Sequence, residues 1–159
     1  MVRNAEARDI PRIAEIIIFG KRVAYRDIFQ NDAVSFQELQ VVNLAGHYNK
    51  NHKLLEQMLV YDDGIVKGVI NRQRRADAIE ICEFYVEPFF LGQGIGTQLL
   101  DKTVQEARQQ GKLSIYLWVI AENQKAREFY EAHGFSASGK TAVIEGTDKL
   151  DMHYEMLVG

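Results

Sequence analysis

Three glycines at alternate positions, Gly92, Gly94 and Gly96, mark a segment whose backbone could bind an anion. They lie between an apolar stretch that ends at Val86 and a segment in which apolar residues recur with helical spacing. The first turn of a helix has unsatisfied N–H groups at a positive dipole end, and glycine lets a phosphate approach them closely. The spacing therefore predicts a backbone cradle for a pyrophosphate.

Two well-known phosphate-binding motifs do not fit this segment. The dinucleotide fingerprint has the spacing G-x-G-x-x-G, whereas the segment here is G-x-G-x-G. The P-loop has a lysine before its Ser or Thr, but here Thr97 follows Gly96 directly. A tight strand-to-helix turn without any ligand is the third interpretation, and the glycines alone do not decide between it and a cradle.

Two carboxylates, Glu80 and Glu83, are candidates for general base because they lie on the strand expected before the glycines. Strand alternation places them on opposite faces, so at most one is expected to face a cleft. Either could equally be a partly exposed sheet residue with a salt partner. Cys82 lies between them, has no histidine nearby in the sequence, and is expected to be a buried strand cysteine rather than a nucleophile. His47 and His52 do not have metal-ligand spacing, so no metal is expected.

The elements that must position these residues follow from periodicity and turn signals. A helix should begin at Asp9-Ile10-Pro11, with Asp9 as its cap, and a second helix should span about 35–48. Further elements are expected in the order that follows: a hairpin of 56–61 and 65–71 around Asp62-Asp63-Gly64, a strand over 79–86, a helix from Ile95 to about Ala107, a buried strand over 113–119, a helix over 123–133, and strands from 135 onward and over 151–158. Arg72, Arg74 and Arg75 are expected in a solvated turn. This order indicates an α/β protein with a mixed sheet flanked by helices.

Length and composition are those of a soluble globular protein. The 159 residues suit one domain over 1–159, with 47% hydrophobic and 26% charged residues. The net charge of −3 argues against a nucleic-acid partner. Neither a signal-peptide pattern nor a membrane span is expected, and a single cysteine fits a reducing cytosol.

The combination of several motifs resembles the GNAT superfamily of acetyl-CoA-dependent N-acetyltransferases. The matching segments are Val86-Glu87-Pro88, Gly92-Gln93-Gly94-Ile95-Gly96, Asn123, Phe129-Tyr130 and Gly134-Phe135. They occur in the family's order and spacing, and the resemblance covers most of the chain. It implies a GNAT-like acyl-CoA N-acyltransferase fold, with a central, mostly antiparallel sheet, two splayed parallel strands and flanking helices.

The resemblance also implies how coenzyme A would be held. In such proteins the glycine loop binds the pyrophosphate through its amides, and the preceding strand lends backbone groups to the pantetheine arm. The implied contacts are Phe84, Tyr85 and Val86 on the strand, and Leu91, Gly92, Gln93, Gly94, Ile95, Gly96 and Thr97 in the loop. Leu91 departs from the family pattern, which has Gln or Arg there, so a side-chain contact to phosphate is missing.

The chemistry implied by the resemblance is acetyl transfer to a primary amine by direct attack in a ternary complex. Tyr130 matches the family tyrosine that protonates the departing thiolate, and its ordinary pKa near 10 keeps it protonated at neutral pH. From the residues alone, the favoured interpretation of Tyr130 is a core residue on an amphipathic helix, beside Ala126 and Phe129. Asn123 fits both a helix N-cap and the family residue that contacts the coenzyme arm.

The group that takes the amine proton stays open between three alternatives. These are Glu80, Glu83 and ordered water. Relatives with a strand glutamate acting through water have it at the position of Glu80, whereas the position at which other relatives have a glutamate is Trp118 here. The acceptor is expected to be a small-molecule or peptide amine, and dimers are common in such proteins. A non-catalytic acyl-CoA-binding module on the same scaffold is the alternative function, and the glycine spacing disfavours a dinucleotide oxidoreductase.

Overall fold

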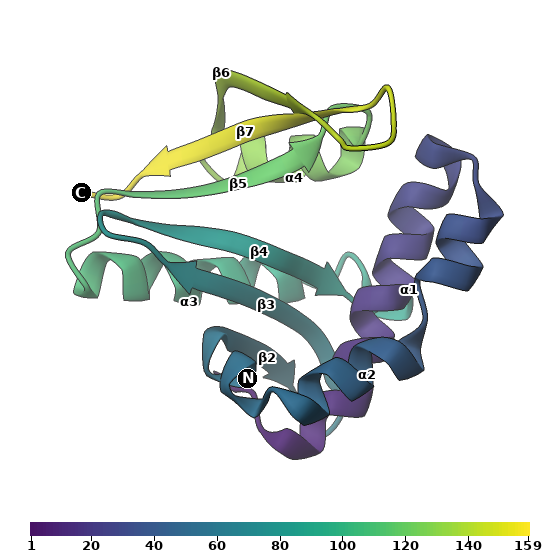
Figure 1. Ribbon diagram of the computed structural model, residues 1–159. Coiled ribbons are helices and arrows are strands. Elements are labelled where there is room, and N and C mark those ends of the chain that lie inside the picture. Colours follow the sequence, from purple (N-terminus) through teal and green to yellow (C-terminus); the bar gives the residue numbers. More distant parts are fainter. The chain divides into compact units, whose positions relative to one another are not determined.

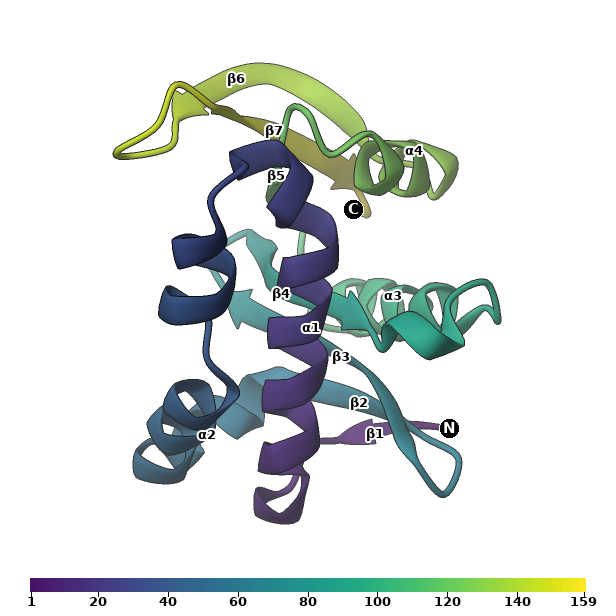
Figure 2. The same cartoon turned by 90° about the vertical axis from the view of Figure 1, so that its right-hand side faces the viewer.

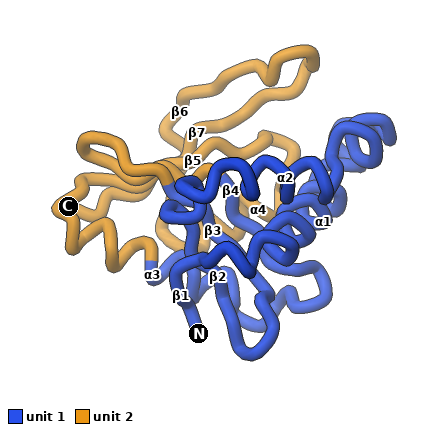
Figure 3. Tube along the Cα trace, turned by 60° about the horizontal axis from the view of Figure 1, so that its bottom comes forward, with its two compact units in different colours: residues 1–72, 83–102 blue, residues 73–82, 103–159 orange.

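The computed structural model describes all 159 residues, which fall into two compact units (Figure 3). Unit 1 comprises Met1–Arg72 and Glu83–Lys102, and unit 2 comprises Gln73–Cys82 and Thr103–Gly159. The hydrogen-bonded strand order is β1-β2-β3-β4-β5-β7-β6, with β4–β5 as the parallel pair. The expected mixed, mostly antiparallel α/β sheet with flanking helices is confirmed.

Unit 1 contains the strands β1 (Val2–Asn4), β2 (Met58–Asp62) and most of β3 (Val66–Arg74). β2 pairs antiparallel with both neighbours, and Gly64 has a φ of 105° in the turn to β3. Glycine alone adopts this conformation without strain. The hairpin expected around Asp62-Asp63-Gly64 is therefore confirmed.

The first helix, α1 (Ile10–Phe29), follows a short 3₁₀ turn over Ala7–Asp9. Asp9 occupies the N-cap position, but its side chain makes no cap hydrogen bond to α1, which corrects the expected role. Its carboxylate instead accepts from the Glu6 amide at 2.8 Å and from both Nη atoms of Arg3 at 2.8 Å. Burial alone would raise the pKa of Asp9, but these hydrogen bonds lower it overall.

The expected second helix over 35–48 is two separate helical segments. A π-helical turn covers Val34–Glu38, and α2 covers Val41–Lys50. Leu39 between them is extended, with φ −86° and ψ 95°. Arg22 of α1 donates to the carbonyls of Ser35 at 2.9 Å and Leu39 at 2.9 Å, so a guanidinium satisfies backbone groups at the break.

The basic residues expected in one turn have different environments. Arg72 and Arg74 lie in β3, and the turn to β4 (Ala78–Val86) begins only at Arg75. Arg72 is half-buried and donates to the Gln57 carbonyl at 3.1 Å, so it belongs to the hairpin of unit 1. The solvated-turn interpretation was therefore wrong for Arg72 and Arg74.

The core of unit 1 lies between its helices and its strands. Figure 2 shows α1 in front of β2 and β3, with α2 beside it. A 3₁₀ segment over His52–Gln57 leads from α2 into β2. The buried side chains of this core come from all of these elements: Ile10, Ile13, Ile16, Ile17, Tyr48, Leu55, Met58, Val60, Val66 and Val69. Burial of this many aliphatic side chains supplies the main driving force for folding of the unit.

Unit 2 contains the start of β4, the strands β5 (Ser114–Ile120), β6 (Ser136–Val143) and β7 (Leu150–Leu157), and α4 (Gln124–Ala132). Figure 1 shows β5, β7 and β6 as adjacent strands, and α3 (Ile95–Gln109) runs from unit 1 into unit 2. The expected order of strands and helices is confirmed here. The expected buried strand begins one residue later than predicted and alternates, because Leu113 and Trp118 are exposed.

Candidate functional site

The glycine loop of unit 1 has the open backbone that the sequence predicts. Gly92 and Gly94 both have a φ of 78°, which L side chains rarely adopt, and a Cβ placed on either would meet nothing within 4 Å. α3 begins directly afterwards at Ile95 and is 15 residues long. The loop therefore presents exposed peptide groups at the N-terminus of a long helix, which suits an anionic group such as a pyrophosphate.

The position of this loop is fixed by the close packing of α3 on β3. A Cβ at Gly68 of β3 would lie 2.9 Å from Ile95 Cγ2 and 3.0 Å from Leu99 Cδ1. Ile95 and Leu99 are themselves almost fully buried. The absence of a side chain at Gly68 thus allows the first turn of α3 to reach the strand.

A second anchor lies just before the loop, at Glu87. Its amide donates to the Lys67 carbonyl at 2.8 Å, and its buried carboxylate pairs with Arg12 of α1 at 3.2 Å. Arg12 also donates to the Val66 carbonyl at 2.7 Å. The chain then turns through the 3₁₀ segment Pro88–Phe90 and passes Leu91 into the glycines. Buried charge pairs of this kind fix geometry more than they add stability.

The strand end over Phe84, Tyr85 and Val86 packs against α1 in unit 1. A Cβ at Gly20 would lie 2.5 Å from Tyr85 Cδ1, so the ring rests directly on the helix backbone. The hydroxyl groups of Tyr25 and Tyr85 share a hydrogen bond of 2.8 Å. These contacts hold the segment that the resemblance assigns to the pantetheine arm.

Leu91 is 61% exposed at the entrance to the loop. Its side chain therefore does not pack beneath the glycines.

Glu83 belongs to unit 1 and pairs with Lys21 of α1 at 3.1 Å. Burial raises the pKa of the nearby Tyr48 to about 12, and the Glu83 charge adds to that rise. Since a lysine ammonium already neutralises Glu83, this carboxylate has the structural salt partner that the simpler interpretation expects.

Glu80 belongs to unit 2 and has different partners. Its Oε1 accepts from Arg75 Nη2 at 2.6 Å and from the Tyr116 hydroxyl at 3.4 Å. Glu80 and Tyr116 also form the last pair of the parallel β4–β5 ladder. Cys82, two residues on, is exposed, which corrects the expected burial because this face of the strand is polar.

Asn123 and Tyr130 lie at the start and in the second half of α4, in unit 2. Asn123 Oδ1 accepts from the Ala126 amide at 3.3 Å, so the expected N-cap is confirmed. Tyr130 is 9% exposed, and its ring packs edge-on against those of Phe129 and Phe135 at 5.6 Å. The predicted site residues thus form two sets: the glycine loop, the strand end and Glu83 in unit 1, and Glu80, Asn123 and Tyr130 in unit 2.

A polar and aromatic cluster in unit 2 was missed by sequence reasoning. His153 of β7 is the register partner of Trp118, and its ring stacks on Tyr116 at 5.2 Å. Its Nδ1 is 2.7 Å from the Ser138 hydroxyl. The cluster draws on three strands, β5, β6 and β7, so only the alternation of β7 could have indicated that His153 and Tyr154 face opposite sides.

The chain shows no group of three or more His, Cys, Asp or Glu side chains arranged to hold a metal ion. None of its helices combines the length and the apolar character that crossing a membrane requires.

The comparisons with known proteins agree on one family. The model of the Acetyltransferase (GNAT) family matches residues 23–135. An uncharacterized N-acetyltransferase of Methanocaldococcus jannaschii is 41% identical over 66 residues, which is 42% of this chain and 29% of that protein. A [ribosomal protein bS18]-alanine N-acetyltransferase of Salmonella typhimurium is 30% identical over 88 residues, 55% of this chain and 59% of the relative. The chain thus spans 29% and 59% of the lengths of these relatives.

A solved structure shows the same fold over nearly the whole chain. The PaiA N-acetyltransferase from Thermoplasma acidophilum, in complex with coenzyme A, superposes with a TM-score of 0.75 at 20% identity, covering 99% of this chain and 98% of that one. Because the family model matches well over half of the sequence, and the loop geometry agrees with it, this chain belongs to the GNAT acetyltransferase family.

Proposed function

We propose that this protein transfers the acetyl group of acetyl-CoA to a primary amine, by direct attack in a ternary complex. The observation that carries the proposal is the open loop with positive φ at Gly92 and Gly94, placed directly before the 15-residue helix α3. Membership of the GNAT family and the coenzyme A complex of the PaiA relative support the same cosubstrate.

In unit 1, the amides of the loop from Leu91 to Thr97 would hold the pyrophosphate. Backbone groups of Phe84, Tyr85 and Val86 would pair with the pantetheine arm, as an added strand does. The anchors at Glu87 and Gly68 support this assignment, since they fix the loop without using its exposed peptide groups.

In unit 2, we assign Tyr130 as the acid that protonates the departing thiolate, and Asn123 as a contact of the coenzyme arm. Acetyl-CoA would supply an activated thioester, and a thiolate that gains a proton as it leaves is a better leaving group. Both carboxylates have an ion-pair partner, and Glu80 is the one that we place near the path of the amine proton, because the resemblance puts the strand glutamate at its position.

The acceptor is a small-molecule or peptide amine, and an α-amino group is the favoured class. An α-amine has a pKa of about 7.7–8.0, against about 10.4 for a lysine side chain, so far more of it is neutral and reactive at pH 7. The relative that acts on the alanine of a ribosomal protein is in keeping with this class. We further propose a single cytosolic domain over 1–159 that forms a homodimer and binds no nucleic acid.

Release of free thiol from acetyl-CoA, measured with a panel of amines, tests the activity. The panel should pair peptides bearing a free N-terminus with Nα-blocked lysine peptides. We expect turnover that is faster with the free N-terminus. Binding of acetyl-CoA without turnover on any amine would favour the non-catalytic acyl-CoA-binding module instead.

Tyr130→Phe tests the proposed acid, because it removes one hydroxyl and keeps the ring packed on Phe129 and Phe135. We expect kcat to fall by about 10²–10⁴-fold, the usual contribution of a general acid, with the Kd of acetyl-CoA nearly unchanged. Tyr61→Phe, on β2 of unit 1, is the matched control and should leave kcat as it is. An unchanged kcat in Tyr130→Phe would make Tyr130 a packing residue.

A further inference from the structure

One face of the sheet in unit 2 carries polar and aromatic side chains that come from several strands. Tyr154 of β7 faces α4, where its hydroxyl contacts Arg127 at 2.9 Å and Glu131 at 2.8 Å. His153 therefore faces the other side, together with Trp118, its register partner on β5. Since Glu80 and Tyr116 are register partners and their side chains are hydrogen-bonded, Glu80 shares this second face.

His153 is held in one orientation by partners on two strands, β5 and β6. Its ring stacks on Tyr116 at 5.2 Å and meets Trp118 edge-on at 5.0 Å. Its Nδ1 is 2.7 Å from Ser138 Oγ. In the tautomer whose Nδ1–H donates to that hydroxyl oxygen, Nε2 is the ring nitrogen that is left to accept a proton from another molecule.

The contact with Ser138 lies where the ladder between β6 and β7 becomes irregular. The register between β6 and β7 shifts between Ala137, opposite Tyr154, and Thr141, opposite Met152, which places the irregular segment beside His153. Gly139 within that segment has a φ of 93°. Bulges re-aim side chains and are frequent next to active sites. The register of Ala137 with Tyr154, continued by one residue, puts Ser138 opposite His153, so the hydroxyl meets the imidazole where the irregular segment begins.

We propose that His153 is the general base of the reaction, and that its Nε2 takes the proton of the acceptor amine beside the exposed ring of Trp118. This inference rests on the proposed acetyltransferase function. Trp118 is 40% exposed whereas His153 is 7% exposed, so the indole can meet a ligand from solvent while the imidazole stays shielded. A cationic amine is attracted to the face of an indole ring.

The proton and bond changes balance without another reactant. The acceptor arrives as an ammonium ion, and one N–H bond breaks as Nε2 takes that proton. The neutral nitrogen attacks the thioester carbon, forming the C–N bond as the C–S bond breaks. Tyr130 gives a proton to the sulfur and regains one from the nitrogen, which loses its second proton on becoming an amide. The imidazolium then returns its proton to water.

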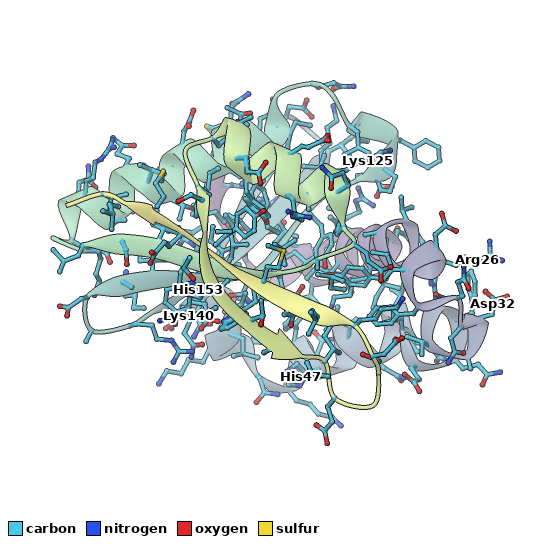
Figure 4. The ribbon with its side chains drawn as sticks, turned by 90° about the horizontal axis from the view of Figure 1, so that it is seen from above. Arg26, Asp32, His47, Lys125, Lys140 and His153 are labelled. Atoms are coloured by element: carbon cyan, nitrogen blue, oxygen red, sulfur yellow. The ribbon has the colours of Figure 1, made fainter.

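Charges on the surrounding strands set the proton affinity of His153. Burial lowers its pKa below the ordinary value of 6.5, and Lys140 of β6, which lies close to it in Figure 4, lowers it further. Glu155 of β7 and Glu80 of β4 act in the opposite direction. Glu80 is itself paired with Arg75 at 2.6 Å, so its carboxylate already has a cationic partner. His153 is consequently neutral at pH 7 and ready to act as a base.

The test is the pH profile of kcat/KM for the full chain, measured with acetyl-CoA and the best α-amine peptide of the panel. The native profile should have an acidic limb below pH 6.5, set by His153. His153→Gln should lower kcat/KM at pH 7 by about 10²-fold or more and abolish this limb, with the Kd of acetyl-CoA retained. His47→Gln, in α2 of unit 1, is the control and should retain both rate and limb.

Two further variants keep the test informative if His153→Gln folds poorly. Lys140→Gln, on an exposed strand, should move the limb to higher pH, because a group that lowers the pKa of His153 is removed. Glu80→Gln should move the limb to lower pH for the opposite reason. A purely structural histidine would give neither shift.

The outcomes separate this inference from the function on which it rests. A native protein that turns over no amine would overturn the proposed function and the role of His153 together. An active native protein whose limb survives in His153→Gln, or stays fixed in both charge variants, would overturn the role of His153 alone. Loss of the limb in Glu80→Gln but not in His153→Gln would assign the base to Glu80.

Discussion

At the scale of single residues, the departure of Leu91 from the family pattern gives a direct prediction. The side chain is 61% exposed at the entrance of the loop, so an arginine in its place can extend toward a bound pyrophosphate without disturbing the core. A charge-assisted hydrogen bond that is partly exposed to solvent should contribute roughly 1.5 kcal/mol. We therefore expect Leu91→Arg to lower the Kd of acetyl-CoA about tenfold.

Salt and a second exposed leucine provide the controls for this variant. The gain should shrink as ionic strength rises, because the new contact is at the surface. Leu157→Arg adds the same charge at another exposed position, on β7 of unit 2, and should change the Kd little. A weaker, salt-insensitive Kd in Leu91→Arg, measured by calorimetry, would mean that the loop requires an apolar residue there.

Individual residues were predictable from the sequence where their role is local. The N-cap Asn123 and the glycines with positive φ depend on neighbours within a few residues, so spacing suffices to identify them. His153 depends on Tyr116, Trp118 and Ser138, which pairing of distant strands brings together. No local pattern predicts such contacts between strands, and the irregular segment that follows Ser138 has only a glycine as its signal.

At the scale of elements, α1 and the end of β4 pack so closely within unit 1 that a small added side chain would disturb the contact. The Tyr85 ring occupies the space that a Cβ at Gly20 would need, at 2.5 Å. Gly20→Ala must therefore displace the Tyr85 side chain close to its Cβ atom, and with it the strand end over 84–86. We expect a loss of about 1–3 kcal/mol of stability, the usual cost of overpacking, together with a weaker Kd for acetyl-CoA.

A second helical glycine serves as the matched control. Gly46 in α2 has nothing within 4 Å of a built Cβ, so Gly46→Ala should be neutral or slightly stabilising. Chemical denaturation and acetyl-CoA binding of both variants check the pair. Equal stability and equal Kd in the two variants would show that the Tyr85 contact yields easily and does not position the strand.

The elements also show where helical periodicity is insufficient to predict the extent of a helix. The pattern over 35–48 predicts one helix, yet the chain becomes extended at Leu39. At this break, Arg22 of a different helix donates to the carbonyls of Ser35 and Leu39 and so compensates for helical hydrogen bonds. Tertiary hydrogen bonds to the backbone carbonyls at a helix break cannot be predicted from the local sequence pattern. Elements with strong turn signals, such as the hairpin at Gly64, were predicted correctly.

At the scale of the whole molecule, the fold class followed from the order of elements, and the family from motifs in a fixed order. The division into two compact units did not follow, because both β3 and β4 contribute to each unit and no linker marks the boundary. The proposed chemistry is likewise divided: the cradle for the coenzyme belongs to unit 1, and the proposed acid and base belong to unit 2.

Coenzyme binding by the glycine loop is the central claim, and calorimetry of acetyl-CoA with two glycine variants tests it most directly. Gly94 and Gly64 both have positive φ, at 78° and 105°, and both have open surroundings, so alanine strains each backbone in a similar way. Only Gly94 belongs to the cradle. The native protein and Gly64→Ala should bind acetyl-CoA alike, whereas Gly94→Ala should bind about tenfold more weakly or worse, since alanine costs roughly 1–2 kcal/mol in this conformation. The absence of binding to the native protein at millimolar acetyl-CoA, or an equal Kd in both variants, would contradict the account.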